Sequence, residues 1–74
     1  MLEINETKPN VFYIRYDGAT IGIVEKIRIY GNTQYKCHFN WVSAVYNSRA
    51  DAISHLLWRS GMTIAEADRI AGAT

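Results

Sequence analysis

The stretch from Ile21 to Trp41 constrains the fold most, because two runs of alternating side chains flank a turn signal. The turn is Tyr30-Gly31-Asn32-Thr33, and glycine reaches the positive φ values that tight hairpin turns need. Successive side chains of a strand point to opposite faces of a sheet, so each run has an apolar and a polar face. The apolar face is predicted to hold Ile21, Ile23, Ile27, Ile29, Tyr35, Cys37, Phe39 and Trp41.

A further predicted strand precedes this hairpin. Residues 11–16, Val-Phe-Tyr-Ile-Arg-Tyr, are β-branched and aromatic, as strands favour, and Asp17-Gly18 is a strong signal for a two-residue turn. Residues 11–42 are therefore predicted to form a three-stranded antiparallel meander. Glu25 interrupts the apolar face of the second strand, which indicates either a nearby bulge or an end that overhangs the core. Residues 1–10 are either a loose arm or a short edge strand.

Two capped helices are predicted after the meander. Ser48 can cap a helix over residues 48–60, whose apolar stripe fits across the sheet. A second capping box at Thr63 opens a short helix over residues 63–71. Residues 42–46 either extend the third strand or lead into the first helix. The expected fold class is α+β, a three-stranded antiparallel sheet packed on one helix, with the short second helix at the carboxyl end. The predicted core contains Ile23, Ile27, Phe39, Trp41, Ile53, Leu56 and Leu57.

Composition narrows the classes of function. The 74 residues make a single domain, residues 1–74, with little room for an enclosed catalytic pocket. A formal net charge of +1 gives no overall attraction to nucleic acid or to an anionic membrane. The single cysteine excludes an internal disulfide and fits a reducing compartment, so we expect a cytoplasmic protein. No apolar run approaches the ~20 residues that span a bilayer, and no membrane partner is expected.

Residues of catalytic or metal-binding type are few and scattered. The spacing of Cys37, His38 and His55 matches no zinc pattern, and no glycine-rich phosphate loop is present. Cys37 falls on the predicted apolar face, where a thiol is usually an inert hydrophobic side chain. We therefore expect no metal, no cofactor and no catalytic residues, and a protein that is not an enzyme.

The polar face of the predicted sheet is the first candidate site. It gathers four of the eight basic residues, with tyrosines between them and no carboxylate. Cations interleaved with aromatic rings suit phosphate pairing and base stacking, although solvated sheet faces often carry the same residue types. The candidate DNA- or RNA-binding residues are Tyr13, Arg15, Lys26, Arg28, Tyr30, Lys36 and His38.

A family resemblance points to the same face. Tyr13-Ile14-Arg15-Tyr16, a turn, a cationic second strand, Tyr35-Lys36-Cys37-His38-Phe39 and Ser48-Arg49-Ala50-Asp51-Ala52-Ile53 follow one another. This order resembles the small arm-DNA-binding domains of phage integrases and the related AP2-type domains, over roughly residues 11–59. The resemblance implies a three-stranded sheet, backed by one helix, whose outer face lies in the DNA major groove. It also implies that the contacts are made by Arg15, Lys26, Arg28 and Lys36.

Trp58 favours a different class of function. It falls on the helix side opposite Ile53 and Leu57, where it is exposed to solvent unless the second helix folds back over it. Exposed tryptophan is enriched at protein interfaces. The alternative function is therefore a phage- or mobile-element-encoded modulator that binds and inhibits a host protein, with the small build of anti-CRISPR proteins.

Overall fold

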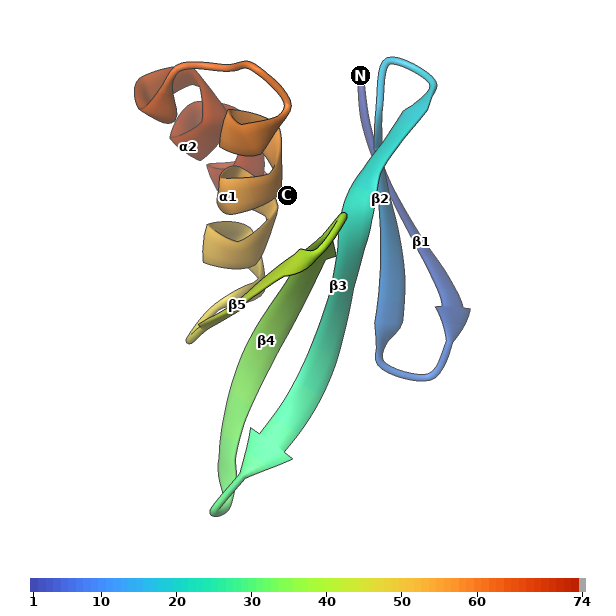
Figure 1. Ribbon diagram of the computed structural model, residues 1–74, viewed down its shortest axis with the longest axis vertical. Coiled ribbons are helices and arrows are strands. Elements are labelled where there is room, and N and C mark those ends of the chain that lie inside the picture. The colour runs from blue at the N-terminus through green and yellow to red at the C-terminus, as the bar shows by residue number, and fades with distance from the viewer. Residues whose placement is uncertain (74) are drawn as a thin grey trace.

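The computed structural model describes residues 1–73 and shows five strands followed by two helices (Figure 1). The elements are β1 (Leu2–Lys8), β2 (Val11–Tyr16), β3 (Ala19–Ile29), β4 (Asn32–Phe39), β5 (Val42–Tyr46), α1 (Arg49–Arg59) and α2 (Ile64–Gly72). All neighbouring strands are antiparallel, in the order β1-β2-β3-β4-β5. The predicted three-stranded sheet on one helix is therefore wrong. The fold is an α+β arrangement of a five-stranded sheet and two helices.

The two additional strands come from residues 2–8 and 42–46, the segments for which the sequence allowed more than one structure. Residues 2–8 pair with β2 and form one edge of the sheet, so they are a strand and not a loose arm. Residues 42–46 form the other edge, because the chain reverses at Asn40-Trp41 immediately after β4. Asn40 has a φ of 53°, a left-handed conformation that asparagine adopts more readily than most residues. The third predicted strand therefore ends before Val42.

Two further turns join the central strands. The turn at Asp17-Gly18 is as predicted, and the second turn is shorter than predicted, because Asn32 and Thr33 belong to β4. Asp17 and Gly18 have φ values of 51° and 85°, and Tyr30 and Gly31 have φ values of 51° and 80°. Positive φ at both central residues is the type I′ geometry, which matches the right-handed twist of the flanking strands. Each turn holds two residues, since Tyr16 pairs with Ala19 in the first hairpin.

A bulge in β3 decides which side chains reach the core. The pairing of β2 with β3 passes from Arg15↔Thr20 directly to Ile14↔Gly22, which leaves Ile21 as an extra residue in β3. An extra residue reverses the alternation of the side chains that follow it. From Gly22 onward the even-numbered residues of β3 therefore lie on the face of the sheet that carries α1, the reverse of the predicted pattern.

The core lies between the sheet and α1. Phe12, Val24, Cys37 and Ala44 lie directly opposite one another across β2 to β5, and α1 packs over β3, β4 and β5. In turn, α2 packs on α1 with two small side chains (Figure 1). None of the helices in residues 1–73 is long and apolar enough to cross a membrane. The buried apolar residues are Ile14, Ile21, Val24, Cys37, Ala52, Ile53, Leu56, Leu57, Ala67 and Ala71.

The predicted core is confirmed on the helix and only in part on the sheet. Ile53, Leu56 and Leu57 are fully buried. The bulge moves Ile23 and Ile27 to the sheet face opposite α1, whereas Phe39 is half-buried and packs against the core. Trp41 is 99% exposed, because it occupies the turn between β4 and β5.

Candidate functional site

The predicted nucleic-acid-binding residues do not form one surface. Directly opposed residues of adjacent antiparallel strands lie on the same face of a sheet. Tyr13 and His38 are both opposite Ile23, on the face that points away from α1, which we call the outer face. Arg15 and Lys36 lie two residues further along β2 and β4 and share this face.

The remaining three predicted residues lie elsewhere. Lys26 is opposite Tyr35 and Arg28 is opposite Thr33, on the face of the sheet that carries the core. Their displacement follows from the bulge at Ile21, which reverses the alternation of β3. Tyr30 is in the turn between β3 and β4 and is 100% exposed. The predicted single basic surface is therefore wrong.

The outer face also carries carboxylates, contrary to the prediction. Glu25 is directly opposite Lys36, and its Oε1 lies 3.6 Å from Nε2 of His38. Glu3 is directly opposite Arg15. The guanidinium of Arg15 donates a hydrogen bond of 2.7 Å to the carbonyl oxygen of Gly18. Cations that lie beside carboxylates exert less net attraction on a phosphate, so this face is a weaker site than expected.

The β3–β4 hairpin ends in a two-stranded ribbon. The pairing of β2 with β3 ends at Glu25 and the pairing of β5 with β4 ends at Tyr35, so the ribbon extends past both neighbouring strands. Figure 1 shows it running away from the two helices. Residues 26–34, which make up the ribbon, contain two cations, Lys26 and Arg28, and no carboxylate. A hollow beside the ribbon is lined by Asn10, Lys26, Ile27, Arg28 and Thr33.

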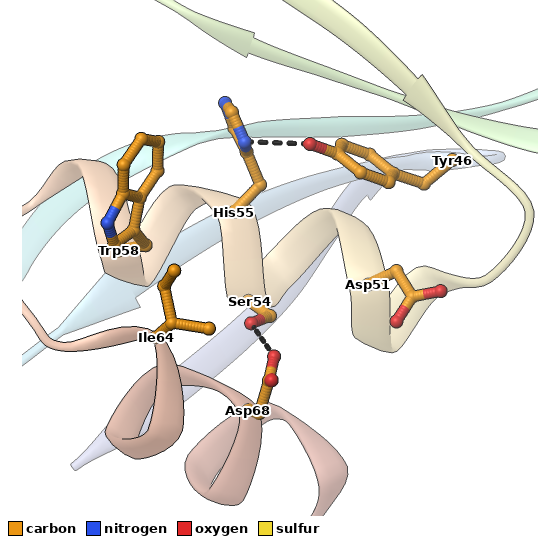
Figure 2. Close-up of a pocket in the computed structure, with 7 residues that line it drawn as sticks. All are labelled: Tyr46, Asp51, Ser54, His55, Trp58, Ile64 and Asp68. Carbon is orange, nitrogen blue, oxygen red and sulfur yellow. Dashed lines mark hydrogen bonds between the residues drawn. The ribbon is translucent and has the colours of Figure 1, made fainter.

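A different hollow lies between the two helices, and we call it the α1–α2 hollow (Figure 2). Its volume is about 320 Å³ and it is open to solvent. The contributing residues of α1 are spaced three and four apart, so they share one side of the helix. The lining residues are Tyr46 from β5, Asp51, Ser54, His55 and Trp58 from α1, and Ile64 and Asp68 from α2.

Three aromatic rings form one wall of the α1–α2 hollow. The imidazole of His55 lies between the other two rings, with centroid distances of 5.5 Å to Tyr46 and 5.7 Å to Trp58 (Figure 2). The Tyr46 hydroxyl oxygen lies 2.7 Å from Nδ1 of His55. In the imidazole tautomer with hydrogen on Nε2, the Tyr46 hydroxyl donates this hydrogen bond. The indole is only partly covered, since Trp58 is 43% exposed.

Two carboxylates complete the lining of the α1–α2 hollow. Ser54 donates a hydrogen bond from its hydroxyl to Oδ1 of Asp68, which ties α1 to α2 (Figure 2). Asp51 lies in the first turn of α1, where a negative charge is favoured by the helix dipole. Both aspartates are exposed. Figure 2 shows hydrogen bonds within two separate pairs, Ser54 with Asp68 and Tyr46 with His55.

The ionisable groups of the α1–α2 hollow give it a negative formal charge at neutral pH. Burial lowers the pKa of the His55 imidazole, and the positive charge of Arg59 acts in the same direction. Burial raises the pKa of the Tyr46 phenol, and Cys37 and Asp51 add to the effect. His55 and Tyr46 are thus both neutral, and none of the seven lining residues carries a positive charge.

Of the predicted site residues, only Trp58 lines this hollow. The other α1 residues of the hollow could be found from their spacing. Once the helix is assigned, Asp51, Ser54, His55 and Trp58 fall on one side of α1. The position of Ile64 and Asp68 in the hollow depends on how two short helices pack together. No pattern within α2 alone indicates that these two side chains line a hollow.

Metal-ligating and nucleophilic side chains form no site in the part of the chain that the structure describes. Within residues 1–73, no three His, Cys, Asp or Glu side chains are grouped so that they could hold a metal ion. Cys37 is buried, and burial raises the pKa of its thiol, as expected for an unreactive cysteine. Comparison of the chain with models of protein families, with curated proteins and with solved structures gives no match.

Proposed function

We propose that this chain is a small non-enzymatic binding protein that contacts another protein through the α1–α2 hollow. The observation that carries the proposal is the position of Trp58, which is 43% exposed and forms a wall of the hollow. Tryptophan is enriched among the residues that dominate binding energy at interfaces, where the decisive side chains lie in pockets. Ile64, on the neighbouring helix, adds apolar surface and is 64% exposed.

The shape of the hollow favours a protein partner over a free small molecule. Small-molecule pockets usually occupy ~300–1,000 Å³ and enclose most of the ligand. The α1–α2 hollow, at about 320 Å³, is at the small end of that range and is open to solvent. A side chain of a partner protein fits such a site, because the surrounding surface of the partner excludes water from the open side of the hollow.

Two tryptophan variants test the proposal. Tagged parent, Trp58→Ala and Trp41→Ala proteins are incubated with nuclease-treated lysate of the organism that encodes the chain. Trp41 is a matched control, since it is 99% exposed and lies at the turn between β4 and β5, outside the hollow. We expect a discrete protein to bind the parent and the Trp41→Ala variant, and the Trp58→Ala variant to lose ~2 kcal/mol or more of binding free energy.

The same experiment contains the outcomes that contradict the proposal. Equal retention of the partner by Trp58→Ala, with its fold verified by circular dichroism, excludes the α1–α2 hollow as the interface. Retention only when nuclease is omitted assigns the binding to nucleic acid. Self-association that Trp58→Ala abolishes, measured by size-exclusion chromatography, identifies a second copy of the chain as the partner.

Nucleic-acid binding through the ribbon of residues 26–34 is a second candidate function. One observation favours it: Lys26 and Arg28 line a shared hollow on a ribbon that carries no carboxylate. Two-stranded β-ribbons are a known means of entering a DNA groove. Tyr30 at the tip is fully exposed, which leaves its ring free to stack. The surface is smaller than the predicted outer face and uses only part of the predicted residues.

A further inference from the structure

We infer that the α1–α2 hollow accepts the guanidinium group of an arginine side chain from the partner protein. This inference rests on the proposed function, because it names the chemical group that the interface recognises. The lining residues combine three aromatic rings, one apolar side chain and two carboxylates. That combination matches an arginine, which has an apolar stem and a flat cationic head.

The charge of the hollow selects a cation over an anion. Asp51 and Asp68 supply two negative charges, and His55 is neutral at neutral pH. The hydroxyl of Ser54 occupies Oδ1 of Asp68, so the second oxygen of that carboxylate remains to accept a hydrogen bond. Arginine presents several N–H donors in a fixed planar arrangement, so it can bond a carboxylate and lie on a ring together.

The aromatic wall favours a flat cation. A cation within ~6 Å of a ring centroid is attracted by the face of the ring, most strongly with tryptophan. The chain itself contains this pairing, since the guanidinium of Arg49 lies 5.4 Å from the centroid of Phe12. The stem of the incoming arginine can lie against Ile64, whose side chain faces the hollow in Figure 2.

One cation of the chain lies near Trp58 and does not fill the hollow. The guanidinium of Arg59 lies 5.9 Å from the centroid of Trp58 and 5.7 Å from that of Phe39. Neither Arg59 nor Phe39 lines the hollow. Arg59 is therefore held beside Trp58 next to Phe39, and an incoming guanidinium meets the rings from the side of Asp51 and Asp68.

The test is a titration with N-acetyl-arginine amide, followed by nuclear magnetic resonance of the indole N–H groups. The chain has two tryptophans, so the Trp58 resonance reports on the hollow and the Trp41 resonance is an internal control. A ligand of this size is expected to half-saturate the site at ~1 mM. We expect a saturable shift of the Trp58 resonance and none of the Trp41 resonance. N-acetyl-citrulline amide, which has the same shape without the charge, is expected to give no saturable shift.

Carboxylate variants identify the acids. Asp51→Asn and Asp68→Asn keep the shape of the side chain, and asparagine can still accept the hydrogen bond from Ser54. Each is expected to weaken binding of the arginine amide roughly tenfold, as expected for loss of a charge-assisted hydrogen bond. Glu66→Gln is the matched control, because Glu66 is an exposed acid of α2 that does not line the hollow. It is expected to leave the affinity unchanged.

The outcomes separate this inference from the proposed function. An unchanged Trp58 resonance at ~10 mM arginine amide, or equal shifts with the citrulline analogue, overturns the inference. Capture of the partner protein that depends on Trp58 still supports the proposed function in that case. The converse result is also possible to distinguish. If the arginine amide binds saturably but Trp58→Ala still captures the partner protein, the hollow binds a cation and the proposed function is contradicted.

Discussion

At the scale of single residues, Gly22 is the glycine with the least room for a side chain. It follows the bulge residue of β3 and faces α1. A Cβ at this position would lie 2.5 Å from Cδ2 of Leu56 and 2.8 Å from the carbonyl oxygen of His38. Leu56 is fully buried and the carbonyl belongs to a paired strand, so neither atom can move away easily. The absence of a side chain at Gly22 therefore sets the distance between α1 and the sheet.

We predict that Gly22→Ala lowers the free energy of unfolding by roughly 1–3 kcal/mol, the usual cost of overpacking a core. Gly72→Ala is the control, since a Cβ there meets no atom within 4 Å. Alanine is the better helix former, so this variant is expected to be more stable than the parent by up to ~1 kcal/mol. Urea denaturation of the three proteins measures both effects. Equal stability of Gly22→Ala and the parent would contradict the close packing of α1 on β3.

The ends of both helices were predictable because they depend on neighbours in the sequence. The backbone N–H of Asp51 donates a 3.1 Å hydrogen bond to the hydroxyl of Ser48. The backbone N–H of Glu66 donates one of 3.2 Å to the hydroxyl of Thr63. Such contacts span three residues and are therefore visible as a local pattern.

The faces of β3 were not predictable in the same way. The bulge lies next to Gly22, and glycine inside a strand is a known bulge signal, but the apolar alternation that predicted the faces of β3 does not show which residue is the extra one. A shift of one residue moved Lys26 and Arg28 to the other side of the sheet and brought Glu25 beside Lys36. The prediction of a single basic surface was therefore wrong because of the extra residue at Ile21, which precedes Lys26 and Arg28 in β3.

At the scale of elements, the ribbon at the end of the β3–β4 hairpin allows a test of the second candidate function. If Lys26 and Arg28 pair with phosphates, removing each charge should flatten the log–log salt dependence of binding by about one unit. We predict this for Lys26→Ala and Arg28→Ala with duplex DNA, measured by fluorescence anisotropy at several salt concentrations. Arg69→Ala is the control, because this residue is an exposed cation of α2. No binding of the parent to duplex or single-stranded nucleic acid at low salt would eliminate this function.

At the scale of the whole molecule, one helical layer covers only one face of the sheet. The outer face keeps several apolar side chains partly exposed, including Tyr13 at 40% and Val45 at 45%. A domain of this length buries roughly 60% of the surface of its unfolded chain, so its total stability is modest. A single partly buried polar group, such as the imidazole of His55, therefore has a measurable influence on the stability of the entire domain.

We predict that the domain loses stability as the pH falls below the ordinary imidazole pKa of ~6.5 because of His55. Burial and the neighbouring Arg59 lower the pKa of His55 in the folded protein. Between ~6.5 and the lowered pKa, His55 is protonated in the unfolded chain and neutral in the folded chain, which favours unfolding. The effect begins as the pH falls through ~6.5 and reaches its limit once the pH is below the lowered pKa of the folded state.

Comparison with His55→Gln isolates this contribution, because the variant keeps His38 and all carboxylates. Urea denaturation at pH 7.5 and pH 5.5 gives the free energy of unfolding for both proteins. The parent is expected to lose more stability than His55→Gln between the two pH values. The other charged or titratable groups of the hollow, Tyr46, Asp51 and Asp68, are present in both proteins. An equal loss in parent and variant would show that His55 takes up its proton as easily in the folded chain as in the unfolded one.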